Sequence, residues 1–226
     1  MAVGIALFAT GARAQASGKA MLVSDYRFRG VSLSDERPAV QVALGYDPPA
    51  RGWYAGGVLS SVRLERRPGA QLAGYAGYAW RATPDLSWEV GSTYTRFSGR
   101  DAYAYAEAYA GFTYRRLVGR VYYAPDYFHA GTPALYAELN ASRALGTQWY
   151  VFGHLGYLRR RGAVDEHRDR ARIDLRLGLG LTLAACTVQL SWTAVQASNG
   201  SDYAFGYPVG RGASREAWVL GVSYAW

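Results

Sequence analysis

The sequence of 226 residues predicts one all-β domain, a transmembrane antiparallel β-barrel of about twelve strands. Three observations predict this fold. Apolar and polar residues alternate along most of the chain, the alternating segments are long enough to cross a bilayer as tilted strands, and the connections between them alternate between long and short. No change in composition divides the chain, so a single domain is expected.

The first residues have the features of a secretory signal peptide. Residues 2–9 are apolar, and two overlapping Ala-x-Ala sites follow, at residues 12–14 and 14–16. We expect a signal peptide over residues 1–14, cleaved after residue 14 or 16, and a single barrel domain over residues 17–226. No basic residue precedes the apolar run, which is compatible with a start inside a longer signal. A short buried helix is the alternative.

Twelve alternating segments follow the expected signal peptide. They span residues 19–29, 38–47, 52–63, 70–80, 85–97, 103–115, 117–125, 134–143, 147–158, 171–183, 186–196 and 215–226. Most reach the roughly 9 to 11 residues that a tilted strand needs to span a membrane, whereas strands of soluble proteins average about 5 to 6. Ten or fourteen strands remain alternatives, because boundaries read from one sequence are approximate.

The segment 171–183 shows the pattern in its clearest form. Ile173 and every second residue to Leu183 are apolar, and Arg172, Asp174 and Arg176 stand between them. A period of two sends these rows to opposite faces of a strand. In a soluble sandwich the leucines would face a core, whereas in a membrane barrel they face lipid and the charges face a lumen.

The connections favour the barrel. Those after odd-numbered segments are long, as in GVSLSDERP, LERRPGA and RRRGAVDEHRDR, and those after even-numbered segments are brief, as in RATP, RR and ALG. Short periplasmic turns and longer extracellular loops are typical of outer-membrane barrels, and a sandwich has no reason to sort its loops in this way. The sequence therefore predicts a protein of the cell outer membrane, in contact with its lipid and lipopolysaccharide.

The end of the chain carries a second localisation signal. In EAWVLGVSYAW, the residues Gly221, Tyr224 and Trp226 match a Gly-x-x-aromatic-x-aromatic pattern that resembles the carboxy-terminal signal of outer-membrane barrels. The resemblance implies that the barrel assembly machinery recognises this strand. Val219 departs from the pattern, which usually has a polar residue at that position.

The beginning of the predicted barrel resembles one porin family. The stretch VSDYRFRGVSLSDERPAVQ, residues 23–41, is similar to the opening of the TorF-type family of outer-membrane porins, and GWYAGGVLSSV, residues 52–62, is similar to that family's third strand. The resemblance implies an outer-membrane channel and supplies no catalytic residues.

The row opposite the apolar one is expected to line the lumen and the solute pathway. Its charged and titratable members are Asp25, Arg27 and Arg29 on the first strand, and Glu89, Glu107, Arg120, Glu138, His154, Arg172, Asp174 and Arg176 on later strands. One hypothesis is that the arginines form a positive ladder through which small anionic solutes diffuse passively. The other is that they pair with the carboxylates across a closed, plugged interior.

Two other function classes remain open. His154, Asn140 and Ser142 lie on neighbouring predicted strands, as a hydrolase related to barrel lipases would require, but their spacing specifies no triad. A closed structural barrel without a pore is the third reading. We predict no catalytic residue and no enzyme.

The formal charge of +8 and the single cysteine restrict the partners. No nucleic-acid-binding motif accompanies the arginines, so no nucleic acid is expected. One cysteine and three histidines give no metal spacing, and we predict no metal or cofactor. Arg159, Arg160 and Arg161 could bind lipopolysaccharide phosphates or simply be solvated. The loop with Tyr203, Phe205 and Tyr207 could fold into the barrel mouth as a constriction.

Overall fold

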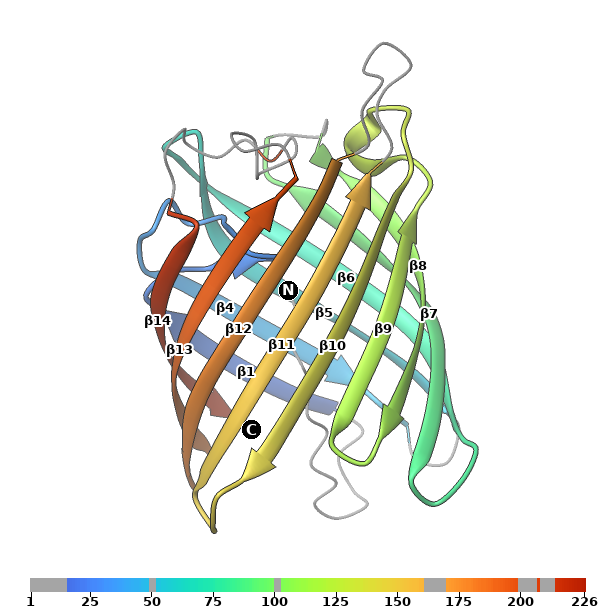
Figure 1. Cartoon of the computed structure of the whole chain (residues 1–226), viewed down its shortest axis with the longest axis vertical. Helices are drawn as coiled ribbons and strands as arrows, with labels where there is room; N and C mark the ends of the chain where they lie inside the picture. Colours follow the sequence, from blue (N-terminus) through green and yellow to red (C-terminus); the bar gives the residue numbers. More distant parts are fainter. Residues whose placement is uncertain (1–15, 49–51, 100–102, 161–169, 199–206, 208–213) are drawn as a thin grey trace.

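A closed antiparallel barrel forms the protein (Figure 1). The computed structural model describes residues 16–48, 52–99, 103–160, 170–198, 207 and 214–226. The barrel strands are β1 (Ala16–Val23), β4 (Ala39–Tyr46), β5 (Trp53–Leu64), β6 (Arg67–Arg81), β7 (Leu86–Phe97), β8 (Tyr105–Tyr114), β9 (Leu117–Ala124), β10 (Ala134–Ala144), β11 (Trp149–Arg160), β12 (Arg170–Leu183), β13 (Cys186–Ala197) and β14 (Glu216–Ala225). Each pairs with its neighbours in chain order, and β1 pairs with β14 to close the ring. The predicted fold class and the count of twelve strands are confirmed.

The two ends of the barrel differ in their connections. At the end where β1 begins and β14 finishes, here called the turn end, the strands are joined by residues 47–52, 82–85, 115–116, 145–148 and 184–185. The opposite end, here called the loop end, carries the longer connections, and Figure 1 shows this end at the top. One predicted long loop is wrong. Glu65 and Arg66, with φ of 50° and 64°, join β5 to β6 in a tight turn, because the strands continue pairing to Leu64 and Arg67.

The inside and outside rows are arranged as the alternation predicts. On β12, Leu177 is 51% exposed on the outer surface, whereas Arg172 and Asp174 are 1% and 3% exposed inside the barrel. The polarity of a soluble protein is therefore reversed. Apolar side chains cover the outside, and charged side chains occupy the interior.

Exposed aromatic side chains mark both ends of the outer surface. Those near the turn end are Tyr46, Trp53, Trp80, Trp88, Tyr114, Trp149, Tyr224 and Trp226. Those near the loop end are Tyr94, Tyr123, Tyr157 and Trp218. Two such girdles around an apolar band are typical of barrels in a bilayer, because these rings combine an apolar body with a polar tip.

The first predicted strand is too long. It was expected over residues 19–29, but β1 ends at Val23 and the chain then turns into the lumen, where β2 (Arg27–Phe28) pairs with β3 (Val31–Ser32). Residues 24–34 are called the lumen hairpin below. Its turn is formed by Arg29 and Gly30, with φ of 49° and 81°, a geometry that favours glycine at the second position.

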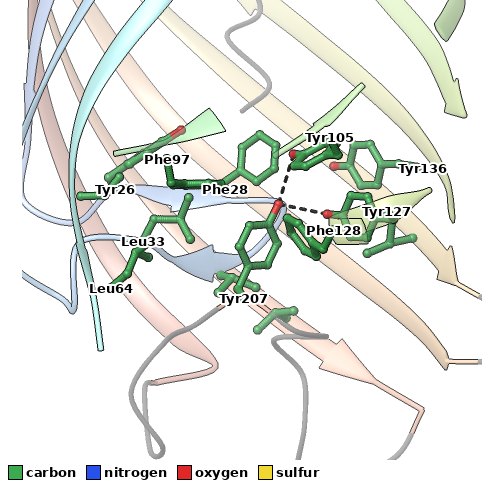
Figure 2. Close-up of a cluster of buried hydrophobic side chains, with 14 of the residues drawn as sticks. Tyr26, Phe28, Leu33, Leu64, Phe97, Tyr105, Tyr127, Phe128, Tyr136 and Tyr207 are labelled. Carbon is green, nitrogen blue, oxygen red and sulfur yellow. Dashed lines mark hydrogen bonds between the residues drawn. The ribbon is translucent and has the colours of Figure 1, made fainter. Parts of the chain in front are cut away.

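A packed core fills the lumen near the loop end (Figure 2). Phe28 of the lumen hairpin contacts the ring of Tyr207, which in turn contacts Tyr127 and Phe128 of the short 3-10 helix η2 (Tyr127–His129). Wall residues such as Phe97 and Leu158 are wholly buried against this cluster. In the described part of the chain, the barrel is therefore closed at this level.

Some predictions fall on residues outside the described ranges. They include the signal peptide over residues 1–14, the loop residue Arg161, and Tyr203 and Phe205. No helix in the described part of the chain has the length and hydropathy needed to cross a bilayer.

Candidate functional site in the barrel lumen

All of the predicted lumen residues point into the barrel and are buried or partly buried. Asp25, Arg27 and Arg29 reach the interior from the lumen hairpin, not from a barrel strand as predicted. The others come from β7 to β12. The geometry separates them into a paired group near the loop end and an open group nearer the turn end.

Arg29 anchors the lumen hairpin to the barrel wall. Its two terminal nitrogens donate to the two carboxylate oxygens of Glu107 on β8, at 2.9 and 2.7 Å. The guanidinium also lies over the ring of Tyr136, 4.1 Å from the ring centre. Burial alone would lower the pKa of Arg29, but Glu107 outweighs it and holds that pKa above its ordinary value. The guanidinium therefore keeps its positive charge, and Glu107 compensates it. Arg29 is not free to bind an anion from solution.

Asp25 organises the hairpin itself. Its carboxylate accepts hydrogen bonds from Arg27 Nε at 2.7 Å, from Ser32 Oγ at 2.6 Å and from Ser34 Oγ at 3.0 Å. Arg27 also donates to the carbonyl oxygen of Ser214, just before β14. These bonds replace the pairing with barrel strands that the hairpin lacks, which explains why the alternating sequence leaves the wall here.

A third ion pair lies on the wall between β7 and β9. Arg120 Nε donates to Glu89 Oε1 at 2.5 Å, and the Tyr54 hydroxyl donates to Glu89 Oε2 at 2.6 Å. The hydroxyls of Tyr54 and Tyr109 are also 2.6 Å apart. Three arginines of the predicted ladder are thus paired with carboxylates, as the closed-interior hypothesis expects.

His154 belongs to a polar cluster. Its Nε2 is 2.9 Å from Asp174 Oδ1 and 3.1 Å from the Tyr136 hydroxyl, and its Nδ1 is 2.8 Å from Asn140 Oδ1. Both ring nitrogens are therefore engaged. Among the described residues no serine hydroxyl contacts His154, so this cluster does not assemble the nucleophile and base of a hydrolase.

The remaining predicted residues complete the interior. Glu138 accepts a hydrogen bond from the Tyr122 hydroxyl at 3.2 Å, and Arg172 is buried two residues before Asp174 on β12. At the loop end, Arg160 donates from Nε to Thr132 Oγ1 at 3.0 Å, which ties the end of β11 to the loop after η2. In the described ranges, no three His, Cys, Asp or Glu side chains come together as metal ligands.

The half of the lumen nearer the turn end is more open. Lys19, Tyr54, Tyr75, Tyr150, Phe152 and Arg176 point inward there and are only partly buried. We call these six residues the vestibule. Arg176 donates from Nε to Ser191 Oγ at 2.9 Å and lies over the Phe152 ring. Neither Arg176 nor Lys19 forms an ion pair with a carboxylate of the described chain.

The predicted lumen row does not contain Lys19 or the aromatic residues of the vestibule. Inward aromatic residues on one strand face inward glycines on the next, and this pairing marks the vestibule. The pairing can be recognised only when the strand register is known.

Tyr207 occupies the mouth as predicted, and its hydroxyl lies 3.0 Å from that of Tyr127 and 3.3 Å from that of Tyr105 (Figure 2). Burial raises the pKa of Tyr207 well above its ordinary value, so the hydroxyl stays protonated. A raised pKa contributes stability that is present below the unfolded value of about 10 and is lost as the pH rises above it.

Replacing Tyr207 with phenylalanine should therefore keep the ring packing and lose the hydroxyl contacts. We expect a loss of about 1 kcal/mol in thermal or urea unfolding at neutral pH, and a smaller loss of stability above about pH 10 than in the wild type. Unchanged alkaline sensitivity in this variant would contradict the role assigned to the Tyr207 hydroxyl.

Known structures share the fold. The chain is similar to the KdgM porin, with a TM-score of 0.58 and 12% identity over 93% of this chain and 99% of that chain. It is similar to the NanC porin, with a TM-score of 0.55 and 10% identity over 92% and 98% of the two chains. It is also similar to the KdgM porin in complex with disordered oligogalacturonate, with a TM-score of 0.55 and 10% identity over 93% of this chain and 99% of that chain. At these identities the likeness shows the fold alone.

At the level of sequence, no curated protein is significantly similar to the chain. The model of one family, described as a bacterial protein of unknown function (Gcw_chp), matches residues 9–224. This match runs through every barrel strand and the lumen hairpin. The chain belongs to the Gcw_chp family of bacterial proteins.

Proposed function

We propose that the protein is an outer-membrane channel for passive diffusion of small solutes, with a mild preference for anions, and that the lumen hairpin closes it in the conformation described here. The observation that carries the proposal is the reversed polarity of a closed barrel with the fold of small porins. An apolar outer band between aromatic girdles fits a bilayer, and a charged interior fits a water-filled path.

The proposal includes the features that lead to the outer membrane. Residues 1–14 act as the signal peptide, and residues 17–226 form the barrel domain. Gly221, Tyr224 and Trp226 present the last strand to the barrel assembly machinery, and the arginine-rich loop end contacts lipopolysaccharide. The resemblance to TorF-type porins supports the same assignment. No step of this function requires an enzyme activity or a cofactor.

The anion preference rests on fewer residues than the sequence predicted. Arg27, Arg29 and Arg120 are neutralised by carboxylates, whereas Arg176 and Lys19 have no carboxylate in ion-pair contact among the described residues. Their charges face the partly open vestibule, where they lower the barrier for an anion and raise it for a cation. A closed structural barrel is the second candidate, favoured by the three ion pairs and the packed loop end.

Planar-bilayer recordings of the refolded protein test both candidates. We expect channel openings above background, more frequent or larger in Glu107→Ala, and a reversal potential under a salt gradient that indicates anion selectivity. Arg176→Gln should reduce that selectivity, because it removes a lumen cation. Arg115→Gln is the matched control, because Arg115 is exposed in the turn between β8 and β9 and pairs with Asp85.

The outcomes separate the parts of the proposal. Absence of openings in both the wild type and Glu107→Ala would contradict a channel and favour the closed structural barrel. Openings with cation selectivity would contradict only the anion preference. A loss of selectivity in Arg115→Gln equal to that in Arg176→Gln would contradict the role of the vestibule.

A further inference from the structure

Aromatic rings in the vestibule lie across glycines of the neighbouring strand. Tyr54 on β5 is the direct register partner of Gly77 on β6, and Tyr75 on β6 is the partner of Gly56 on β5. A Cβ added to either glycine would collide with the ring of its partner. Each tyrosine therefore occupies the space that a side chain on the facing glycine would fill, and the two rings are inclined to each other by 52°.

The same arrangement recurs on β11 and β12. Tyr150 is the register partner of Gly180, and Phe152 is the partner of Gly178. A Cβ at either glycine would again collide with the facing ring. In the order of strands around the barrel, β11 lies six places from β5, and β12 lies six places from β6. In a ring of twelve strands these positions are opposite, and Figure 1 shows β11 and β12 in front of β5 and β6.

The lumen thus has two facing aromatic walls. Their four rings remain partly exposed, in contrast to the fully buried Phe97 and Leu158 near the loop end. A ring that rests on a glycine is held in place on the wall, and it loses little further rotational freedom when a ligand stacks on its exposed part. Exposed aromatic rings of this kind favour flat or chair-shaped rings over open chains of the same size.

A cation stands beside one of these walls. The Arg176 guanidinium carbon lies 5.0 Å from the centre of the Phe152 ring, and its Nε is held by Ser191. Its terminal nitrogens donate to no described residue. The Tyr150 hydroxyl accepts a hydrogen bond from Gln189 Nε2 at 2.7 Å, which holds that ring in place. A carboxylate attached to a stacked ring would meet Arg176.

We propose that the vestibule is a binding site for a six-membered ring bearing a carboxylate, which stacks on the aromatic walls formed by Tyr54, Tyr75, Tyr150 and Phe152 and pairs with Arg176. The inference names the solute class of the channel and in that respect rests on the proposed function. Glycine opposite an aromatic residue also stabilises strands, which would be a purely structural role for the rings. The test must therefore separate stacking on a ligand from packing on the wall.

Isothermal titration calorimetry on the full chain, refolded in detergent, measures binding without requiring conduction. The probes are D-glucuronate, a ring with one carboxylate, and D-gluconate, an open chain of six carbons with the same charge. Benzoate, an aromatic ring with one carboxylate, and hexanoate, an open chain with the same charge, form a second pair. The two pairs show whether the site prefers a sugar ring or an aromatic ring. We expect at least one ring probe to bind roughly tenfold more tightly than its open-chain partner.

Variants assign the preference to the walls. The double variant Tyr75→Leu and Phe152→Leu keeps apolar packing on the glycines and should abolish the difference between ring and chain, whereas Tyr75→Phe should preserve it. Arg176→Gln should weaken the ring and chain carboxylates by a similar factor. A difference in gel mobility between heated and unheated samples verifies that each variant has folded.

Equal binding of ring and chain in both arms by the wild type would overturn the inference, as would a ring preference that survives in the leucine double variant. Neither result depends on conductance. Ring-selective binding without channel openings would support the binding site and contradict the channel. Channel openings without any ring preference would support the channel and contradict the binding site.

Discussion

Replacing Glu107 with alanine is expected to release the lumen hairpin and to raise the conductance of the barrel. The side chains of Arg29 and Glu107 are each 4% exposed, so the variant leaves an uncompensated guanidinium in a dry environment. Removing one partner of such a pair costs roughly 3 to 5 kcal/mol. The hairpin can avoid this cost by moving Arg29 into water, because β2 and β3 pair only with each other and not with a barrel strand.

Single-channel recordings and protease accessibility of residues 24–34 measure this release. Glu89→Ala is the control, because its partner Arg120 belongs to a barrel strand and cannot leave the wall. The double variant Arg29→Met and Glu107→Leu should stay closed, because apolar residues of similar size often replace a buried ion pair without loss of stability. A Glu107→Ala variant with wild-type conductance and wild-type protection of the hairpin would contradict the anchoring role of the pair.

Placing arginine at position 177 is expected to destabilise the barrel by about 2 to 4 kcal/mol in a bilayer, because Leu177 lies near the middle of β12 on the apolar outer surface. Leu183→Arg should cost only about 0 to 1 kcal/mol, because position 183 ends the same strand at the turn end, where an arginine can reach water. Urea unfolding of protein refolded into vesicles measures both costs.

Leu177→Ala is the matched control, because it removes apolar surface without adding a charge. Its cost should fall well below that of Leu177→Arg in vesicles. An equal cost for arginine at positions 177 and 183 would contradict the membrane assignment of the outer surface, since a protein surrounded by water has no depth dependence of this kind.

Much of the barrel could be predicted because its determinants are local. Alternation in 171–183 assigns Ile173 to the outside and Arg172 to the inside whatever the partner strands are, since successive side chains on a strand point to opposite faces. Strand length and the difference between long and short connections are also read along the chain. These features led to twelve strands and to the placement of the turn end and the loop end.

The lumen hairpin shows where local pattern failed. Its sequence alternates like a strand, so the first strand was extended to residue 29. The Arg29-Gly30 turn was present in the sequence, but the alternation on either side outweighed it. The decisive contacts lie far away: Arg29 meets Glu107, and Arg27 meets the carbonyl oxygen of Ser214.

The sequence by itself determined a barrel of about twelve strands with apolar residues outside and charged residues inside, because alternation and strand length are properties of neighbouring residues. Only the tertiary structure decided which charges are neutralised and which remain available. Ion pairs and ring faces depend on strand register and on positions opposite each other around the barrel. For this reason Arg29 anchors the lumen hairpin through Glu107, while Arg176, a member of the same predicted ladder, faces the vestibule.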